Sequence, residues 1–496
     1  MPEHFDVLIV GAGLSGIGAA CHLEREVPGK RYAILEAREA IGGTWDLFRY
    51  PGIRSDSDMF TLGYAFKPWK SGQSIADGES IREYVCETAR EYDVERHIRF
   101  GHRVLSADWS SATATWTVEV ERDGGERTQL SAKFVYWCSG YYRYDEGFSP
   151  VFPGIERFGG EVVHPQHWPE DLAYDGKRVV VIGSGATAVT LVPSMADRAA
   201  HVTMLQRTPT YIVALPGRDA MADALRHRLP AQAAYVLVRW KNVLRMLLSY
   251  QFSRRRPQVM KRILRRFLER QLPAGYDIDR DFTPDYDPWD QRLCVVPDGD
   301  LFEAIRQGQA SVVTDRIRTF TEAGIELESG QHLDADIVIT ATGLNMQLLG
   351  GAEVSVDRAP VDLPSTVAYK GMMLSGVPNM ALALGYTNAS WTLKCDLISD
   401  YVCRLLRYLD EQSLDSVTPL EPDPAEPRVP LIDLKSGYVL RAAEQLPKQG
   451  TRVPYRLHQN YFRDIGMFRR APISDPALRF DVARAASTEA PALAAA

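Results

Sequence analysis

The sequence contains one supersecondary pattern twice, and each copy begins with an apolar run typical of a strand buried on both faces. Three small residues in G-x-G-x-x-G/A spacing follow each run. The two copies are residues 5–10 with Gly11, Gly13 and Gly16, and residues 178–182 with Gly183, Gly185 and Ala188. The first glycine allows a tight turn, the second lets the backbone approach a pyrophosphate, and the third small residue packs the helix on the strand. The repeat predicts an α/β fold with two Rossmann-like dinucleotide-binding domains.

The residues that end the second strand of each unit have opposite charge. The first unit's strand ends at Glu36, whose carboxylate can accept from ribose hydroxyls and would repel a 2′-phosphate. The second unit's strand ends at Arg207 and Thr208, and a guanidinium beside a hydroxyl suits a 2′-phosphate. This contrast predicts FAD at the first site and NADPH at the second, with a solvated surface arginine as the alternative for Arg207.

Composition limits the partners and the compartment. A net charge of −7 over 496 residues argues against nucleic acid as a main partner. The six cysteines include no C-x-x-C pair and no metal-ligand spacing, which predicts free thiols and no metal site. Residues 1–10 indicate a strand rather than a signal peptide, and no apolar run reaches the roughly 18 residues that a membrane-spanning helix requires. We therefore expect a cytoplasmic protein.

Residues 158–169 follow the pattern F-x-G-x-x-x-H-x-x-x-W-P, whose spacing fits neither a helix face nor a strand face. The members of the pattern are Phe158, Gly160, His164, Trp168 and Pro169. His164 has two ring nitrogens that can hold backbone or cofactor groups, although a lone histidine in a loop is more often structural. The whole pattern resembles the fingerprint of the Baeyer–Villiger monooxygenases, flavoproteins that depend on FAD and NADPH.

Residues 42–56, GGTWDLFRYPGIRSD, extend this resemblance with the string G-G-x-W-x-x-x-x-Y-P-G-x-x-x-D. A pair of glycines permits a tight bend beside a flavin. The resemblance implies that Gly43, Trp45 and Asp56 lie at the cofactor. Core packing is the alternative for Trp45, and a loop cap is the alternative for Asp56.

The resemblance also implies that Arg292 is the family's active-site arginine and that Asp56 orients it. A fixed cation of this kind would stabilise the charge that develops when oxygen attacks a carbonyl. A surface ion pair with Asp287 or Asp290 is the alternative. Many family members have lysine directly before this arginine to help hold NADP, whereas this chain has Gln291. Because the lysine is absent, more of the selection of NADPH over NADH would depend on Arg207.

The resemblance covers nearly the whole chain and is closest to the ethionamide-activating subgroup of mycobacteria. It implies an enzyme that uses O₂ to convert ketones to esters or lactones and that also oxidises sulfur in thioethers and thioamides. A heteroatom-oxidising flavin monooxygenase is the alternative, although such relatives end the pattern at 158–169 without Trp-Pro. A peripheral membrane protein with vestigial nucleotide sites is an alternative of another class, and the intact glycines argue against it.

Strand and helix patterns predict how the chain crosses between the two units. A meander is expected over 103–138, a strand at 334–343 and a helix over 391–410. The resemblance implies that the strand returns the chain toward the FAD domain and that the helix covers the flavin, with an ordinary strand–helix corner as the alternative for the latter. The predicted segments are 1–147 and 375–482 for the FAD domain, 148–215 and 291–374 for the NADP domain, 216–290 for a helical insertion in the NADP domain, and 483–496 for a flexible tail.

Residues 235–270 carry eleven basic residues and one acidic residue, Glu269, with apolar residues between them. A local charge of about +10 in an acidic protein is typical of a helical insertion that lies on an anionic membrane surface, here the inner face of the cell membrane. A solvated helical subdomain and a contact between copies in a homo-oligomer are the other interpretations. Nucleic acid is not expected, because the few aromatic residues of this stretch do not alternate with its basic residues in a pattern that suits base stacking.

Overall fold

The computed structural model describes residues 2–483, so the predicted tail lies outside the described residues apart from Ala483. The strands of the larger sheet are β1 (Glu3–Val10), β2 (Tyr32–Leu35), β3 (Ile98–Arg99), β4 (His102–Ser110), β5 (Thr115–Arg122), β6 (Arg127–Trp137), β19 (Glu353–Val356), β20 (Ala359–Pro360) and β23 (Met380–Leu382). Their order is β20-β19-β4-β5-β6-β1-β2-β3, with β23 beside β6. Strands β2, β1, β6 and β23 are parallel, and the predicted meander supplies β4, β5 and β6.

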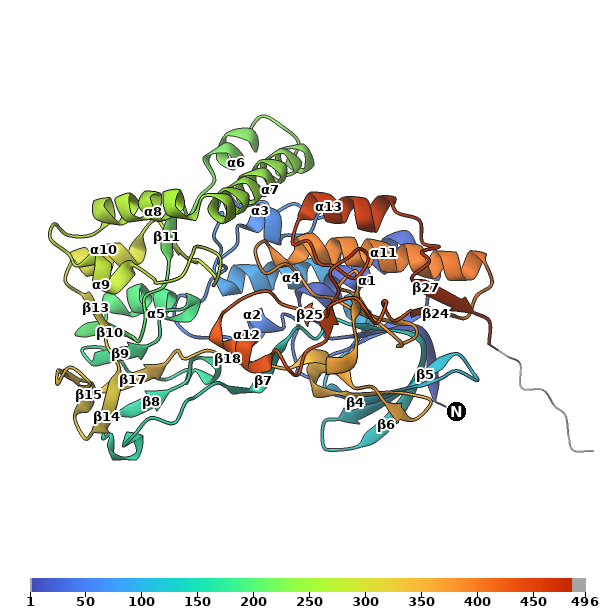
Figure 1. The fold of residues 1–496 in the computed structure, drawn as a ribbon, viewed down its shortest axis with the longest axis horizontal. Helices are drawn as coiled ribbons and strands as arrows, with labels where there is room; N and C mark the ends of the chain where they lie inside the picture. The colour runs from blue at the N-terminus through green and yellow to red at the C-terminus, as the bar shows by residue number, and fades with distance from the viewer. Residues whose placement is uncertain (1, 484–496) are drawn as a thin grey trace, which may run out of the picture.

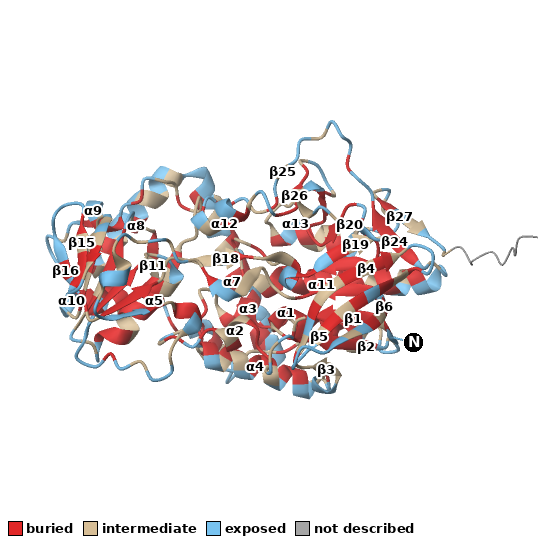
Figure 2. Cartoon of the chain, turned by 90° about the horizontal axis from the view of Figure 1, so that it is seen from below, coloured by how far each residue is buried: buried red, intermediate tan, exposed pale blue. Residues whose placement is uncertain are grey.

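Both faces of the parallel strands are covered. Val7 and Ile9 of β1 point into the core shared with helices α1 (Leu14–Glu26), α4 (Gly78–Glu91) and α11 (Trp391–Glu411). Leu8 points to the opposite core, which contains Trp109 and Trp116 of the meander. All three β1 side chains are fully buried, and Figure 2 shows the strand β1 mainly in the colour of buried residues. Burial of β1 on both faces therefore explains why residues 5–10 form an uninterrupted apolar run, as expected.

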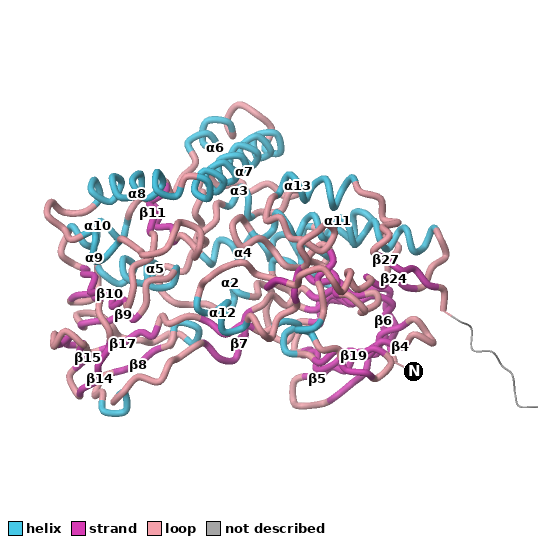
Figure 3. Tube along the Cα trace, viewed as in Figure 1, coloured by secondary structure: helices cyan, strands magenta, loops and turns pink. Residues whose placement is uncertain are grey.

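The second sheet is parallel throughout and has the order β13-β10-β9-β17-β8. Its strands are β8 (Glu161–Val163), β9 (Arg178–Ile182), β10 (His201–Gln206), β13 (Ala310–Thr314) and β17 (Ile337–Thr340). Helices α5 (Ala186–Ala196) and α10 (Asp300–Arg306) cover one face. The hairpins of β14 (Ile317–Thr321), β15 (Gly324–Leu327) and β16 (His332–Asp334) cover the other, and Figure 3 shows the two units side by side.

A two-stranded ribbon joins the units, because the chain crosses between them once in each direction at the same place. The ribbon consists of β7 (Tyr142–Gly147) and β18 (Leu344–Met346), which pair antiparallel. Phe148 N donates to Gly343 O at 3.1 Å, and Thr342 Oγ1 donates to Phe148 O at 2.6 Å. The end of the segment 334–343, which was predicted to return the chain to the first unit, lies at this crossing.

The insertion consists of α6 (Ala220–Leu225), α7 (Ala231–Arg255), α8 (Pro257–Gln271) and α9 (Ile278–Phe282), and it contacts both units. On α7, Val243 and Leu247 join the core of the first unit, and Leu268 of α8 joins the core of the second. The guanidinium of Arg239 is buried and donates to the carbonyls of three residues around α3 (Met59–Leu62): Phe60, Thr61 and Gly63. The chain enters the insertion from the second unit, but α7 packs on the first.

Strands β19 and β20 join the larger sheet through β4, although they fall within the segment 291–374 that we assigned to the second unit. The chain reaches the first unit soon after it leaves β18, so its return lies earlier in the sequence than the predicted boundary between residues 374 and 375. The six cysteines are free thiols. No helix within residues 2–483 combines the length and the apolar character needed to cross a membrane.

Candidate active site

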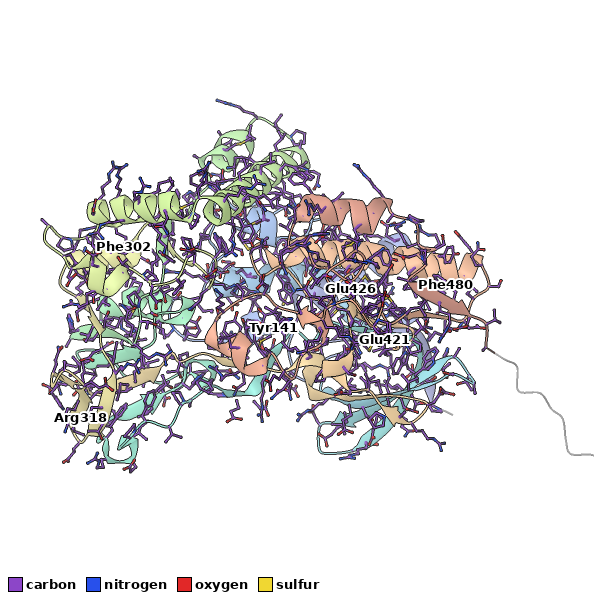
Figure 4. All side chains as sticks on the ribbon, in the orientation of Figure 1. Tyr141, Phe302, Arg318, Glu421, Glu426 and Phe480 are labelled. Atoms are coloured by element: carbon purple, nitrogen blue, oxygen red, sulfur yellow. The ribbon has the colours of Figure 1, made fainter. Side chains whose placement is uncertain are left out.

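A cavity of about 580 Å³ lies where the first glycine-rich turn meets the ribbon between the units. Tyr141, which precedes the ribbon and lines the cavity, lies near the centre of the molecule in Figure 4. The predicted site residues that line the cavity are Gly11, Gly13, Glu36, Gly43, Trp45, Asp56 and Arg292. These residues come from distant parts of the chain, so the fold assembles the first predicted nucleotide site and the predicted catalytic pair around one space.

Gly11 and Gly16 of the first turn, and Gly43 beside it, occupy places that disfavour any side chain. Gly11 has φ +104°, and a Cβ there would lie 2.8 Å from Cys138 O. A Cβ on Gly16 would lie 1.8 Å from Gly11 O, so α1 can approach the turn only with glycine at this position. Gly43 has φ +58°, and its Cβ would lie 3.1 Å from Gly13 Cα. Bare backbone therefore lines this end of the cavity, as close approach of a pyrophosphate requires.

Glu36 lies at the end of β2, buried at the edge of the same cavity. Its carboxylate accepts from Ala12 N at 2.6 Å and from Arg38 N at 2.9 Å. Burial raises the pKa of Glu36, and the two backbone N–H groups oppose that shift. The carboxyl group is thus held against the glycine-rich turn, where a ribose hydroxyl would be its natural further partner.

The guanidinium of Arg292 faces the carboxylate of Asp56 across the cavity wall, with Nη1 3.5 Å from Oδ2. Asp56 raises the pKa of Arg292 well above its usual value, against the opposing effect of burial, so the guanidinium stays charged. The alternative partners, Asp287 and Asp290, are occupied elsewhere. Their partners are Lys261 for Asp287, and Arg254 and Lys435 for Asp290.

Aromatic side chains that the sequence did not single out surround this arginine. Tyr141 lies 5.1 Å from Trp391 between ring centroids, and its hydroxyl is 3.3 Å from that of Tyr142. Tyr438 of α12 (Gly437–Ala442) lies 6.4 Å from Tyr142. Burial raises the pKa of Tyr142 and of Tyr438, so both phenols stay protonated and can donate hydrogen bonds. The sequence signal that could have indicated this wall was the pair of consecutive tyrosines, Tyr141 and Tyr142, directly after the predicted meander.

The fingerprint residues hold the ribbon rather than line the cavity. His164 Nδ1 accepts from Gln166 N at 3.2 Å, and its ring packs so closely on Gly147 that a Cβ there would lie 2.0 Å from Cε1. Burial lowers the pKa of His164, so the ring is neutral at pH 7. Gln166, which sequence analysis missed, is buried and donates to Arg143 O at 2.9 Å and to Tyr144 O at 2.8 Å. The loop is therefore hydrogen-bonded to the backbone of β7.

The remaining fingerprint residues anchor this loop in the second unit. Phe158 packs on Phe320 with ring centroids 6.0 Å apart. Gly160 lies against β17, where a Cβ would be 2.3 Å from Asp336 O. Trp168 packs on the core of the second unit, and Pro169 follows it half-buried. The irregular spacing of the motif therefore reflects a connection fixed at both ends, as expected from the pattern.

The second glycine-rich turn has the same close packing as the first. Gly183 has φ +139°, and a Cβ there would lie 2.3 Å from Ala341 O. Ala188, in the first turn of α5, is fully buried. A Cβ on Gly185 would meet no atom within 4 Å, so the backbone at the start of α5 faces open space. A pyrophosphate could reach the free N–H groups of this helix end.

The residues predicted to select NADPH lie outside the cavity. Arg207 and Thr208 are exposed directly after β10, and Ser184 Oγ donates to Thr208 O at 3.3 Å. This contact places them beside the second glycine-rich turn. Gln291 lies half-buried before β12 (Cys294–Pro297), next to Arg292. A solvent-exposed guanidinium at this turn is free to meet a phosphate.

Comparison with known families assigns the chain. The model described as "Flavin-binding monooxygenase-like" matches residues 73–367, and the model described as "NAD(P)-binding Rossmann-like domain" matches residues 9–69. The chain belongs to the flavin-binding monooxygenase-like family. This flavin-binding monooxygenase is 58% identical over 481 residues to the "FAD-containing monooxygenase EthA" of Mycobacterium tuberculosis, covering 97% of this chain and 98% of that protein. It is 51% identical over 484 residues to the "Probable FAD-binding monooxygenase AlmA" of Acinetobacter baylyi, covering 97% of both.

Solved structures show the same fold at lower identity. A steroid monooxygenase bound to NADP has a TM-score of 0.71 at 24% identity, covering 85% of this chain and 88% of that chain. A cyclohexanone monooxygenase bound to ε-caprolactone has a TM-score of 0.69 at 23% identity, covering 84% and 90%. The predicted family resemblance, the α/β fold with two Rossmann-like domains and the assignment as a flavin-dependent monooxygenase are confirmed.

Proposed function

We propose that this flavin-binding monooxygenase contains FAD, uses NADPH and O₂, and converts small-molecule ketones to esters or lactones in a Baeyer–Villiger reaction. We further propose that it oxidises sulfur in thioethers and thioamides, as the resemblance to the ethionamide-activating subgroup implies. Six free thiols support a reducing, cytoplasmic location.

The ion pair of Arg292 with Asp56 carries this proposal. Attack of oxygen on a ketone carbonyl leaves negative charge on the carbonyl oxygen, and a pre-positioned cation stabilises that charge at little reorganisation cost. Arg292 lines the cavity, and Asp56 holds it charged. The pair lies in the same cavity as the first glycine-rich turn, so the cation and a bound flavin would share one space.

The cavity fits FAD by its bare glycine backbone and its carboxylate. Gly11, Gly13 and Gly16 would form the pyrophosphate cradle, Glu36 would hold the ribose, and Gly43 and Trp45 would contact the flavin. Bound FAD, reduced by NADPH, would activate O₂, so that one oxygen atom is transferred to substrate and the other leaves as water. The chain's part is to bind the cofactor, to place Arg292 beside the substrate, and to exclude water with the aromatic wall of Tyr141, Tyr142 and Trp391.

The second turn would hold NADPH. Gly183 and Gly185 would bind its pyrophosphate above Ala188, while Arg207 and Thr208 would bind the 2′-phosphate. Gln291 would take the place of the lysine found in many relatives and donate a neutral hydrogen bond where they donate a charged one. The buried Nε2 of His164 has no hydrogen-bond partner within residues 2–483, and it would be satisfied by a cofactor group or by the ribbon backbone.

Product analysis tests this function. The purified flavoprotein is incubated with NADPH, O₂ and either phenylacetone or a thioether, and the products are identified by mass spectrometry. An ester from the ketone supports the Baeyer–Villiger reaction. A sulfoxide from the thioether without any ester from the ketone would make the protein a heteroatom-oxidising flavin monooxygenase instead.

A further inference from the structure

Helix α7 is apolar on two opposite sides, although a helix packed on a single core has a polar outer side. One side, which includes Val238 and Val243, is buried against the first unit. The other side carries a stripe of exposed apolar residues at helical spacing, in which Leu248 is 67% exposed. The members of this outer stripe are Leu237, Trp240, Leu244, Leu248 and Phe252.

Two neighbouring helices extend the stripe into one surface. Phe462 of α13 (Tyr461–Ile465) is exposed, and its ring lies 5.7 Å from that of Trp240. Helix α8 presents Val259 and Ile263 to solvent. Figure 1 shows α8, α7 and α13 along the same upper edge of the molecule, and we refer to their exposed residues as the three-helix face.

The basic residues of 235–270 divide into two groups. Five have acidic partners in the structure, which neutralise them: Arg239, Lys241, Arg254, Lys261 and Arg265. Six form no ion pair with any residue of 2–483 and are exposed: Arg245, Arg255, Arg256, Arg262, Arg266 and Arg270. The acidic residue of this stretch, Glu269, pairs with Arg265. The unpaired arginines therefore give the three-helix face an uncompensated positive charge.

On α8 the unpaired arginines and the apolar residues share one side of the helix. Arg262, Arg266 and Arg270 follow each other at four-residue spacing beside Ile263, opposite the buried Leu264 and Leu268. A helix side that faces only water does not require exposed branched apolar residues between its arginines. Apolar groups that enter the acyl boundary, with arginines at the depth of the phosphates, account for both kinds of side chain.

We infer that the three-helix face docks on the surface of an anionic lipid bilayer, with the apolar stripe of α7 in the interface and the six arginines against the phosphates. A second copy of the chain fits less well, because two such faces would bring twelve unpaired arginines together. This inference does not depend on the reaction at the active site.

Vesicle co-sedimentation of the full-length flavoprotein tests the inference. Vesicles of phosphatidylcholine with phosphatidylglycerol are compared with vesicles of phosphatidylcholine alone. We expect binding to the anionic vesicles that falls steeply with salt, and at least tenfold weaker binding to neutral vesicles, since each arginine near the surface contributes about fivefold. Absence of binding to anionic vesicles would overturn the inference.

Two sets of variants separate the apolar and charged parts of the face. Leu244→Ser with Leu248→Ser, and Arg262→Gln with Arg266→Gln and Arg270→Gln, should each weaken vesicle binding at least about tenfold. The control for the apolar variant is Val151→Ser, at a residue of the second unit that is 96% exposed and lies outside the three-helix face. The control for the arginine variant combines Arg316→Gln, Arg358→Gln and Arg452→Gln, at exposed positions that form no ion pair within residues 2–483. Flavin absorbance and the melting temperature show whether each variant is folded.

Three results would contradict the docking surface. Equal loss of binding in the control variants would mean that net charge alone attracts the protein to vesicles. A change of oligomeric state in the Leu244→Ser and Leu248→Ser variant, measured by analytical ultracentrifugation without lipid, would assign the face to a contact between copies. Complete displacement from vesicles by duplex DNA at equal phosphate concentration would assign the arginines to nucleic acid.

Discussion

Arg292 Nη1 lies 3.5 Å from Asp56 Oδ2, although Arg292 follows the helical insertion and Asp56 follows the first glycine-rich turn. Each residue lines the same cavity, and neither uses the alternative partners that the sequence offered. Arg292 directly precedes β12, which pairs with β11 (Ile212–Leu215) in the core of the second unit, whereas Asp56 directly precedes α3 of the first unit. The position of the proposed catalytic cation thus depends on contacts between the units.

Replacing Arg292 by alanine should abolish ester formation while the flavin is still reduced by NADPH. Loss of one pre-positioned donor lowers turnover by about 10²–10³. Bleaching of the flavin by NADPH under nitrogen measures reduction, and mass spectrometry measures the ester. Arg318→Ala, which removes a surface arginine paired with Glu326, should leave both unchanged. Ester formation at the normal rate in the Arg292→Ala protein would remove this residue from the mechanism.

Replacing Arg207 by alanine should remove the preference for NADPH over NADH. A charge-assisted hydrogen bond to phosphate contributes about 1.5–3 kcal/mol, so KM for NADPH should rise about 10- to 100-fold while KM for NADH stays constant. Initial rates of flavin reduction with each dinucleotide give both values. Arg198→Ala is the control, since this arginine is exposed in the same unit and pairs with Asp175. An unchanged ratio of the two KM values would make Arg207 an ordinary surface residue.

Replacing Gln166 by leucine should destabilise the ribbon. Its amide satisfies the carbonyls of Arg143 and Tyr144, and leaving buried acceptors without donors costs about 1–3 kcal/mol. Urea unfolding measures the loss of stability. Gln232→Leu, at an exposed position on α7, should change the free energy of unfolding by no more than about 0.5 kcal/mol. Equal stability of the two variants would show that the fingerprint loop does not depend on this amide.

Replacing Arg239 by methionine should cost far more than the same change at Arg245 on the same helix. Arg239 is buried and donates to three carbonyls, with Asp396 3.5 Å away, so its loss leaves a buried carboxylate without its cation. Breaking such a pair costs about 3–5 kcal/mol, whereas an exposed, unpaired arginine contributes about 0.5 kcal/mol or less. Thermal unfolding of the Arg239→Met and Arg245→Met variants is monitored through the release of flavin. Similar melting temperatures of the two variants would contradict this role for Arg239.

Stability should fall with acidification in a way that depends on His164. Burial lowers the folded-state pKa of His164 below its usual 6.5, so near that pH the unfolded chain binds more protons than the native protein. Stability is therefore lost as pH drops through about 6.5, by at most about 1.4 kcal/mol per pH unit from this one group. Urea unfolding from about pH 7.5 to 5.5 should show a shallower dependence in His164→Asn than in the wild type. The exposed His227→Asn should match the wild type, and an equal slope in His164→Asn would refute the assignment.

The local parts of the fold could be predicted from the sequence because their causes lie within a few residues. Apolar runs at 5–10 and 178–182 predicted strands that the structure contains, and the helix expected after the first glycine-rich turn is α1. The backbone conformation of Gly11 and Gly183 was predictable for the same reason, since a turn of this kind excludes a Cβ wherever it occurs.

Resemblance to a family supplied the candidate pair of Arg292 and Asp56, because no spacing in the sequence joins them. Gln166 and Tyr438 were missed. The importance of Gln166 depends on which carbonyls of β7 its amide meets, and that of Tyr438 depends on where α12 packs, which neither residue type nor periodicity indicates.

The sequence by itself determined two dinucleotide-binding units, the opposite charges at the ends of their second strands, and a basic segment after the second turn. Tertiary structure decided which units those elements join. It placed α7 on the first unit and assembled the cavity from both halves of the chain. It also paired five of the eleven basic residues with acids and left six without an acidic partner among residues 2–483. The physical reason is the distance along the chain over which each feature is determined. Strand and helix preferences depend on residues near in sequence, whereas a site between units depends on packing between segments that are far apart in sequence.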